Sequence, residues 1–233
     1  MIRKLGIIGA MQDEVHDLFN LMEDRKTETV GRWQTYSGKL SGKDCVIVRS
    51  GIGKVNMAAC TQMLIDRYDV DFVINTGVAG SLDAAINIGD IVISKDCIQH
   101  DMDAVAFGYD IGVIPQMDCS TFVADEKAGK TAYEVCRKVN PEIGVGFGRV
   151  LSGDVFVADK ARKDYLVKTF NGKCTEMEGA AMAQVAYINK VPFLVLRAIS
   201  DKADGSANMD YHQFELQAIK HMVKLVSAMA GEI

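Results

Sequence analysis

Short apolar runs alternate along the chain with longer segments whose apolar residues recur at helical spacing. Six runs rich in Val, Ile and Leu predict strands over 5–10, 44–50, 71–77, 90–98, 146–153 and 192–200. Five segments with a helical period predict helices over 12–22, 54–68, 125–139, 178–190 and 211–230. Such alternation is typical of a mostly parallel sheet with helices on its faces. The pattern therefore predicts an α/β protein, and we expect residues 1–233 to form one domain.

Composition and charge narrow the possible partners. The 233 residues carry a formal net charge of −5 at pH 7 and include three prolines, which leaves little room for a linker. Nucleic-acid binding needs clustered Lys and Arg, so we expect no nucleic-acid partner. No apolar stretch approaches the ~20 residues of a membrane span, and the N-terminal apolar run is too short for a signal peptide. We expect a cytoplasmic protein without membrane contact.

The cysteines, histidines and glycine loops do not indicate a metal or a cofactor. The six cysteines form no C-x-x-C pair, which predicts reduced thiols. HDMD (100–103) offers two carboxylates and an imidazole, a set that more often makes a hydrogen-bonded turn than a metal site. GIGKVN (51–56) resembles a dinucleotide fingerprint, but Asn56 replaces its third glycine. We therefore expect neither metal nor cofactor.

Small, polar and acidic residues follow most of the predicted strands. AMQDE, GIGK, TGVAGS, GDVF and DKADGS come after the first, second, third, fifth and sixth strand. Ligands of open α/β sheets bind at the carboxyl ends of the strands, so these segments predict a site. Its acids would be Glu14, Glu176, Glu178 and Asp201. Singly, each could instead cap or stabilise a helix N-terminus; together they favour a crevice for a polyhydroxy or cationic group.

The segment TEMEG (175–179) places two of these acids two residues apart. Residues two apart share a face in an extended chain but point ~200° apart in a helix. If both glutamates face one site, the chain is extended through Glu176 and the helix begins near Glu178. A carboxylate accepts two hydrogen bonds from neighbouring hydroxyls, so Glu178 is suited to hold a ribose diol.

Seven segments in this order resemble the 5'-methylthioadenosine/S-adenosylhomocysteine nucleosidases of the nucleoside phosphorylase superfamily: GIIGAMQDEV, SGIGKVN, NTGVAGS, HDMDAVAFGY, SGDVF, EMEGAA and RAISDKAD. The resemblance spans nearly the whole chain. It implies a three-layer α/β/α sandwich around a central mixed sheet, and a homodimer. It also implies hydrolysis of 5'-methylthioadenosine and S-adenosylhomocysteine to adenine and the 5'-substituted ribose, which serves methionine salvage and the removal of methyltransferase by-products.

The resemblance further implies the residues that carry the reaction. Asp201 would protonate adenine N7, with Ser200 positioning it, and Glu14 would activate the attacking water on the other ribose face. Arg197 would help order Glu14 and the water. The two-carboxylate arrangement predicts inversion at the ribosyl carbon, by analogy with glycosidases.

The same resemblance implies the substrate contacts. Met177, Glu178 and Glu176 would hold the ribose. Phe156 would stack on adenine while the backbone of Val157 reads its edge. The further implied binding residues are Ala79 and Gly80, then Met11, Ile52 and Tyr211 in the 5' pocket, which Phe107 and Pro115 of the partner subunit would close. The apolar, aromatic loop 106–115 favours that dimer, because exposed apolar stretches often bind a partner.

Three functions remain open from the sequence. Related phosphorylases carry an arginine after the first strand, whereas this loop reads AMQDEV, whose acids repel phosphate and suit a water. A hydrolase is therefore favoured over a phosphorylase. The third possibility is a nucleoside-binding protein without turnover. Glu14 and Asp201 count against it, because binding alone needs no acid and base pair.

The range of substrates stays open. Val78 and Ser81 replace a hydroxyl residue and a glycine of many family members. Some relatives with this loop cleave 6-amino-6-deoxyfutalosine, and 5'-deoxyadenosine is a further possible substrate.

Overall fold

The computed structural model describes the backbone of residues 2–233 and the side chains of 2–207 and 214–233. The strands are β1 (Lys4–Gly9), β2 (Glu23–Val30), β3 (Trp33–Leu40), β4 (Lys43–Arg49), β5 (Phe72–Ser81), β6 (Ile91–Gln99), β7 (Phe122–Val123), β8 (Val145–Ser152), β9 (Cys174–Glu176) and β10 (Phe193–Asp201). The helices are α1 (Gln12–Asn20), α2 (Lys54–Tyr68), α3 (Glu126–Val139), α4 (Lys160–Phe170), α5 (Gly179–Asn189) and α6 (Ala207–Ala230). All the strands and helices expected from the hydrophobic pattern are confirmed, within a few residues at their ends.

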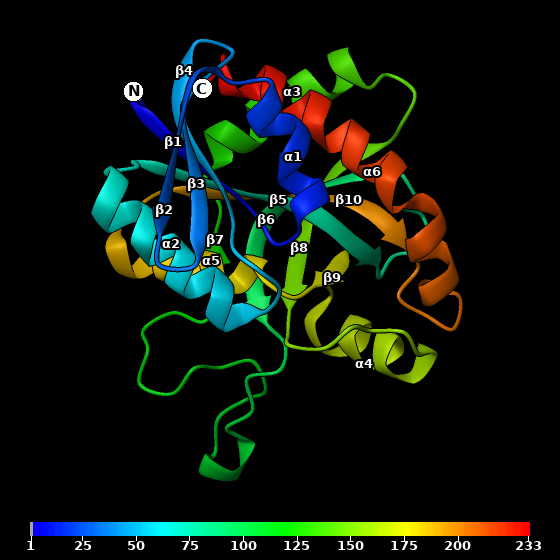
Figure 1. Cartoon of the computed structure of the whole chain (residues 1–233). Coiled ribbons are helices and arrows are strands. Elements are labelled where there is room, and N and C mark those ends of the chain that lie inside the picture. The colour runs from blue at the N-terminus through cyan, green and yellow to red at the C-terminus, as the bar shows by residue number, and fades with distance from the viewer. Residues whose placement is uncertain (1) are drawn as a thin grey trace.

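The elements form three layers with the sheet in the middle. Helices α2 and α5 pack together on one face, whereas α1, α3 and α6 lie on the other (Figure 1). The central strands β1, β5 and β10 are buried along nearly their whole length. Near-continuous apolar strands are what a sheet covered on both faces requires. The α/β/α sandwich is thereby confirmed.

The sheet is mixed, as the resemblance implied, and not mostly parallel as the alternation alone predicted. Strands β4, β1, β5 and β10 run parallel in that order. Strand β6 joins β10 in the antiparallel sense, and β2, β3 and β4 form antiparallel hairpins. Strands β6, β8 and β9 continue from β10, and β9 returns to pair with β5. The five strands β5, β10, β6, β8 and β9 therefore close into a ring.

Several elements gave no signal in the hydrophobic pattern. Strand β2 has the sequence EDRKTETV and is exposed along almost its whole length, so it lacks the alternation of a half-buried strand. Helix α4 buries only Leu166 and Phe170. Strand β9 has three residues. Pairing with neighbouring strands, rather than local pattern, specifies β2 and β9.

The segment that follows β6 projects from the body of the molecule. It carries the short 3-10 helix η1 (Val105–Phe107), and it extends below the sheet in Figure 1. Phe107 is 84% exposed at its tip. Among the described residues, no helix is long and apolar enough to cross a membrane.

Candidate active site

A cavity of about 440 Å³ opens at the carboxyl ends of β1, β5 and β10, where β9 leads into α5. This is the edge of the sheet at which the sequence predicted a site. The lining residues are Ala10, Met11, Glu14, Ile52, Val78, Ala79, Gly80, Phe156, Thr175, Glu176, Met177, Glu178, Ser200 and Asp201. The four predicted acids are all among them.

Glu14 lies in the first turn of α1 with its carboxylate fixed from three directions. One oxygen, Oε2, accepts hydrogen bonds from the backbone N–H groups of Ala10 (2.6 Å) and Met11 (2.9 Å). The other, Oε1, accepts one from Val78 N–H (3.2 Å) on β5. Burial raises the pKa of Glu14, while the charge of Arg197 and these N–H groups oppose the rise. The result is an oriented carboxylate that accepts a proton more readily than an exposed one.

Two glycines of β5 let the acids approach the backbone closely. A Cβ on Gly77 would lie 2.4 Å from Oε1 of Glu14, and one on Gly80 would lie 2.7 Å from Oδ1 of Asp201. Both distances are far below van der Waals contact. The glycines of TGVAGS thus have a steric reason that the strand pattern did not reveal.

Glu176, Arg197 and Asn75 form the floor of the cavity. The two charged side chains are 3% and 2% exposed and make an ion pair, with Arg197 Nε donating to Glu176 Oε2 at 3.1 Å. Arg197 also donates to the Asn75 side chain. Glu176 accepts further hydrogen bonds from the Ser152 hydroxyl and from the N–H groups of Glu178 (3.1 Å) and Gly179 (2.8 Å). Buried charges need this degree of pairing.

The floor bears on two roles that the resemblance implied. The structure places Glu176 at the cavity wall beside Met177 and Glu178, but its carboxylate is already hydrogen-bonded to protein groups. Among the described contacts, Arg197 makes no hydrogen bond to Glu14 and acts on it through charge. Ribose contact by Glu176 and ordering of the water by Arg197 stay predictions.

Glu178 stands at the N-cap of α5 and faces the cavity. The chain is extended through Glu176 and the helix begins at Gly179, as the spacing of the two glutamates predicted. Glu178 Oε1 accepts a hydrogen bond from Gly53 N–H at 2.8 Å. Burial, and then the negative charge of Glu176, raise the pKa of Glu178. This carboxylate has few protein donors and is therefore open to hydroxyl donors from a ligand.

A set of contacts that we call the rim junction ties three loops together beside Glu178. Lys54 Nζ bonds to Asp101 Oδ1 at 2.6 Å, and Lys54 N–H donates to Asp154 Oδ1 at 2.8 Å. Asp154 N–H donates in turn to Asp101 Oδ2 at 2.9 Å. The Lys54 contact lowers the pKa of Asp101 despite its partial burial. The junction joins residues of GIGK, HDMD and SGDVF, three segments far apart in the sequence, so no single motif predicted it.

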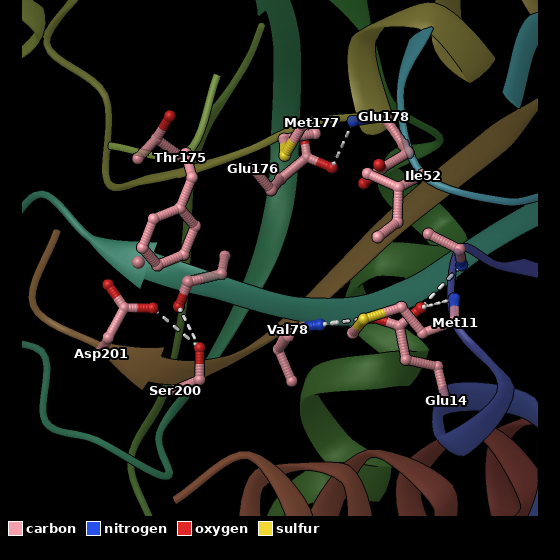
Figure 2. Close-up of a pocket in the computed structure, with 14 residues that line it drawn as sticks. Met11, Glu14, Ile52, Val78, Thr175, Glu176, Met177, Glu178, Ser200 and Asp201 are labelled. Atoms are coloured by element: carbon pink, nitrogen blue, oxygen red, sulfur yellow. Dashed lines mark hydrogen bonds between the residues drawn. The ribbon is translucent and has the colours of Figure 1, made fainter. Parts of the chain in front are cut away.

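Asp201 ends β10 on the other side of the cavity. Its Oδ2 accepts a hydrogen bond from the Ser200 hydroxyl (2.9 Å), and its Oδ1 accepts one from Ala203 N–H (2.8 Å). The carboxyl is 2% exposed. Figure 2 shows Asp201 and Ser200 at one end of the cavity, and Glu14 and Met11 at the other. A ligand between them would meet an acidic side chain at each end.

Of the remaining predicted residues, some lie at the cavity and others do not. Val157 lies beside a recess of about 30 Å³ that Phe156, Thr175 and Asp201 also line, so it belongs to the Asp201 end of the cavity. The Tyr211 side chain lies outside the described residues. Phe107 and Pro115 lie in the projecting segment and do not line the cavity of their own chain.

Three lining residues were not among the predicted contacts: Ala10, Val78 and Thr175. Each adjoins a predicted site residue in AMQDE, TGVAGS or CTEMEG. Whether each residue lines the cavity depends on the side of the strand or turn on which it lies. Only its position next to a predicted site residue could have indicated it from the sequence. HDMD itself is a hydrogen-bonded turn in which Asp101 binds Lys54. Among the described residues, no group of three His, Cys, Asp or Glu gathers to hold a metal.

Known proteins resemble this chain over its whole length. The sequence profile of the Phosphorylase superfamily matches residues 4–230. The 5'-methylthioadenosine/S-adenosylhomocysteine nucleosidase of Geobacillus sp. (strain WCH70) is 39% identical over 231 residues, which is 99% of both chains. That of Bacillus subtilis (strain 168) is 40% identical over 224 residues, 96% of both.

Solved structures agree with these sequence matches. The Neisseria meningitidis 5'-methylthioadenosine/S-adenosylhomocysteine nucleosidase in complex with methylthio-immucillin-A superposes with a TM-score of 0.95, at 36% identity and full coverage of both chains. The futalosine hydrolase of Helicobacter pylori strain 26695 superposes with a TM-score of 0.93 at 34% identity, covering 100% of this chain and 99% of that one.

Proposed function

The chain belongs to the 5'-methylthioadenosine/S-adenosylhomocysteine nucleosidase family of the phosphorylase superfamily, and from this premise we propose that it hydrolyses the N-glycosidic bond of adenine nucleosides. Its substrates are 5'-methylthioadenosine and S-adenosylhomocysteine, which yield adenine and the 5'-substituted ribose. The observation that carries the proposal is the pair of buried, oriented carboxyl groups, Glu14 and Asp201, at opposite ends of one cavity. The reaction serves methionine salvage and removes by-products of methyltransferases.

Asp201 is the proposed general acid. As the C1'–N9 bond breaks, its electron pair moves to adenine, which is a poor leaving group without a proton. Asp201 donates that proton to N7, while the Ser200 hydroxyl and the Ala203 N–H keep the carboxyl oriented. Phe156, at the mouth of the cavity, stacks on the base, and the Val157 backbone reads its edge.

Glu14 is the proposed general base. A water attacks C1' from the face opposite adenine, and its proton passes to the Glu14 carboxylate, which three backbone N–H groups hold in place. Met177 and Glu178 hold the ribose hydroxyls. The carboxylates around the ribose stabilise the positive charge that develops on its ring as the bond to adenine breaks.

Charge at the cavity favours water over phosphate as the nucleophile. The lining residues that the structure describes include acids but no lysine or arginine. The buried Arg197 beneath them is paired with Glu176. A phosphate dianion would therefore meet carboxylates without a free cation, which is unfavourable.

We further propose that the enzyme is a homodimer in which Phe107 and Pro115 of the partner subunit close the 5' pocket. Large apolar side chains are exposed on η1, β7 and the helices α2 and α5: Val55 (79%), Phe107 (84%), Val123 (74%) and Ile188 (60%). Apolar exposure of this extent is typical of protein interfaces. Light scattering of the wild type and of Phe107→Ala tests this. A fully active monomer would contradict it.

Two smaller proposals concern the chain as a whole. The match over residues 4–230 supports one nucleosidase domain. All six cysteines are free and five of them are buried, which supports a reducing compartment and hence the cytoplasm. Limited proteolysis and a thiol titration of freshly lysed cells test these two statements.

The decisive experiment measures adenine release from 5'-methylthioadenosine with and without phosphate. We expect equal rates in both conditions, with free methylthioribose as the second product. Asp201→Asn and Glu14→Gln should each remove at least about 10²-fold in turnover while an inert substrate analogue still binds. Release that requires phosphate would identify a phosphorylase. The structural similarity to futalosine hydrolase justifies 6-amino-6-deoxyfutalosine as a further substrate in the same assay.

A further inference from the structure

A second hollow lies beside the substrate cavity on the same edge of the sheet. It has a volume of about 450 Å³ and is lined by Gly31, Arg32, Trp33, Arg49, Ser50, Gly51 and Asn56. Residues Ser50 and Gly51 follow the carboxyl end of β4, and Ile52, next along the chain, lines the substrate cavity. The turn 50–52 is therefore the wall between the two spaces.

Hydrogen bonds on both sides hold this wall in place. Ser50 N–H and Gly51 N–H donate to the carbonyls of Gly9 (2.9 Å) and Ala10 (3.2 Å) at the substrate cavity. From the other side, Trp33 Nε1 donates to Ser50 O at 3.1 Å. The Asn56 side chain donates to the last carbonyl of the turn, Ile52 O, at 2.7 Å. The Trp33 ring is thus fixed relative to the substrate cavity.

The hollow carries uncompensated positive charge. Arg32 and Arg49 both line it, and no acid lies among the described residues that do. Neither guanidinium has an ion pair or hydrogen bond with any residue whose side chain the structure describes. Elsewhere, Arg3, Arg67, Arg149 and Arg197 each pair with an acid. Arg25 instead donates to Phe19 O and the Asn20 side chain, and Arg137 lies over the Tyr133 ring. Guanidinium groups bind carboxylates through two parallel hydrogen bonds, and an aromatic ring beside them suits a planar group.

We propose that this hollow is a subsite for a carboxylate at the far end of a long 5' substituent. The inference rests on the proposed function, because the 5' pocket beside Met11 and Ile52 then directs such a substituent along the wall toward Arg32 and Arg49. S-adenosylhomocysteine ends in a carboxylate, whereas 5'-methylthioadenosine carries no charge on its 5' group. The two arginines therefore discriminate between substrates and take no part in the chemistry.

Four substrates and two substitutions test the subsite. The substrates are 5'-methylthioadenosine, the neutral long-chain 5'-butylthioadenosine, S-adenosylhomocysteine and 5'-(3-carboxypropylthio)adenosine, which has the carboxylate without the amine. Arg32 and Arg49 are both exposed, so each contact is partly screened by solvent. In Arg32→Gln/Arg49→Gln, we expect kcat/KM for the two carboxylates to fall about 5- to 30-fold. The two neutral substrates should change less than about twofold. High salt should reproduce the pattern in the wild type.

The controls distinguish a carboxylate subsite from a general loss of activity and from a general anion site. Arg137→Gln removes an exposed charge from α3, away from the hollow, and should leave all four rates unchanged. An equal loss on charged and neutral substrates, or no loss on the carboxylates, would overturn the subsite. The subsite would also be overturned if phosphate binds the wild type while the arginine variant still distinguishes charged from neutral substrates as the wild type does. The hollow would then be a general anion site. Failure of the wild type to cleave 5'-methylthioadenosine would instead refute the proposed function.

Discussion

The floor of the cavity and its wall hold carboxylates under opposite conditions. On the floor, Glu176 is ion-paired with Arg197 and accepts hydrogen bonds from a serine hydroxyl and two backbone N–H groups. In the cavity wall, Glu14 and Glu178 are about as buried as Glu176 but receive only backbone donors, and burial raises the pKa of both. A carboxylate whose charge is paired within the protein belongs to the fold, whereas a carboxylate with fewer protein partners is available to a substrate. The same residue type thus serves structure in one place and chemistry a few residues away.

Removing the floor cation should have the largest effect on stability. In Arg197→Met the Glu176 carboxylate stays buried without its partner, so we expect the free energy of unfolding to fall by about 3–5 kcal/mol. Urea unfolding measures this. Adding Glu176→Gln should recover part of the loss, because the unpaired charge is then gone. An Arg197→Met variant as stable as the wild type would show that the ion pair on the floor does not contribute to stability.

A methyl group beneath Glu14 should separate activity from stability. In Gly77→Ala the new Cβ would meet Glu14 Oε1 at 2.4 Å, so the carboxylate must shift. A misplaced catalytic group costs about 10²-fold in rate, so we expect a fall of that size in kcat. Gly146→Ala on β8 is the matched control, since nothing lies within 4 Å of its added Cβ. Equal kcat values for the two variants would contradict the assigned position of Glu14.

Glu178→Gln should act mainly on substrate binding. The amide keeps the shape and can still accept from Gly53 N–H, but it loses the charge-assisted hydrogen bonds to the ribose hydroxyls. We expect KM to rise about tenfold, consistent with the loss of about 1.5 kcal/mol, with a smaller change in kcat. Steady-state kinetics against the neutral substrate decides this. A fall in kcat alone would place Glu178 in the chemical step instead.

The raised pKa values of Glu14 and Glu178 should also make stability depend on pH. A carboxyl whose folded pKa lies above its unfolded value binds its proton more tightly when folded. Stability therefore falls as pH rises from the unfolded value of ~4.3 through the raised folded pKa. We expect urea midpoints to fall progressively across this window, which for Glu178 extends to its raised pKa of about 8. Glu178→Gln should show a shallower slope, and an unchanged slope would argue that Glu178 does not titrate there.

The strands, the helices and the acids could be predicted from the sequence because they depend on local pattern, whereas the mixed sheet followed only from the family resemblance. Apolar runs specify the central strands; Asp201 ends one of them and Glu14 lies in the first turn of the helix after another. The Glu176–Arg197 pair was beyond such reasoning, since it requires β9 to close the ring against β5. The rim junction joins Lys54, Asp101 and Asp154 from three loops, and no single motif contains two of them. Strand β2 was not predicted because a polar edge strand has no periodic pattern of apolar residues.

The closure of the strand ring has a consequence for synthesis of the protein. Strand β10 supplies both Arg197 and Asp201 and also fills the gap between β5 and β6, although it is made near the end of the chain. A nascent chain that has emerged only as far as α5 holds Glu176 without its cation and β5 with one edge unpaired. Such an edge favours pairing with other chains. We therefore expect ribosome-bound intermediates to recruit chaperones until β10 emerges, and the nucleoside site to form in a late folding step.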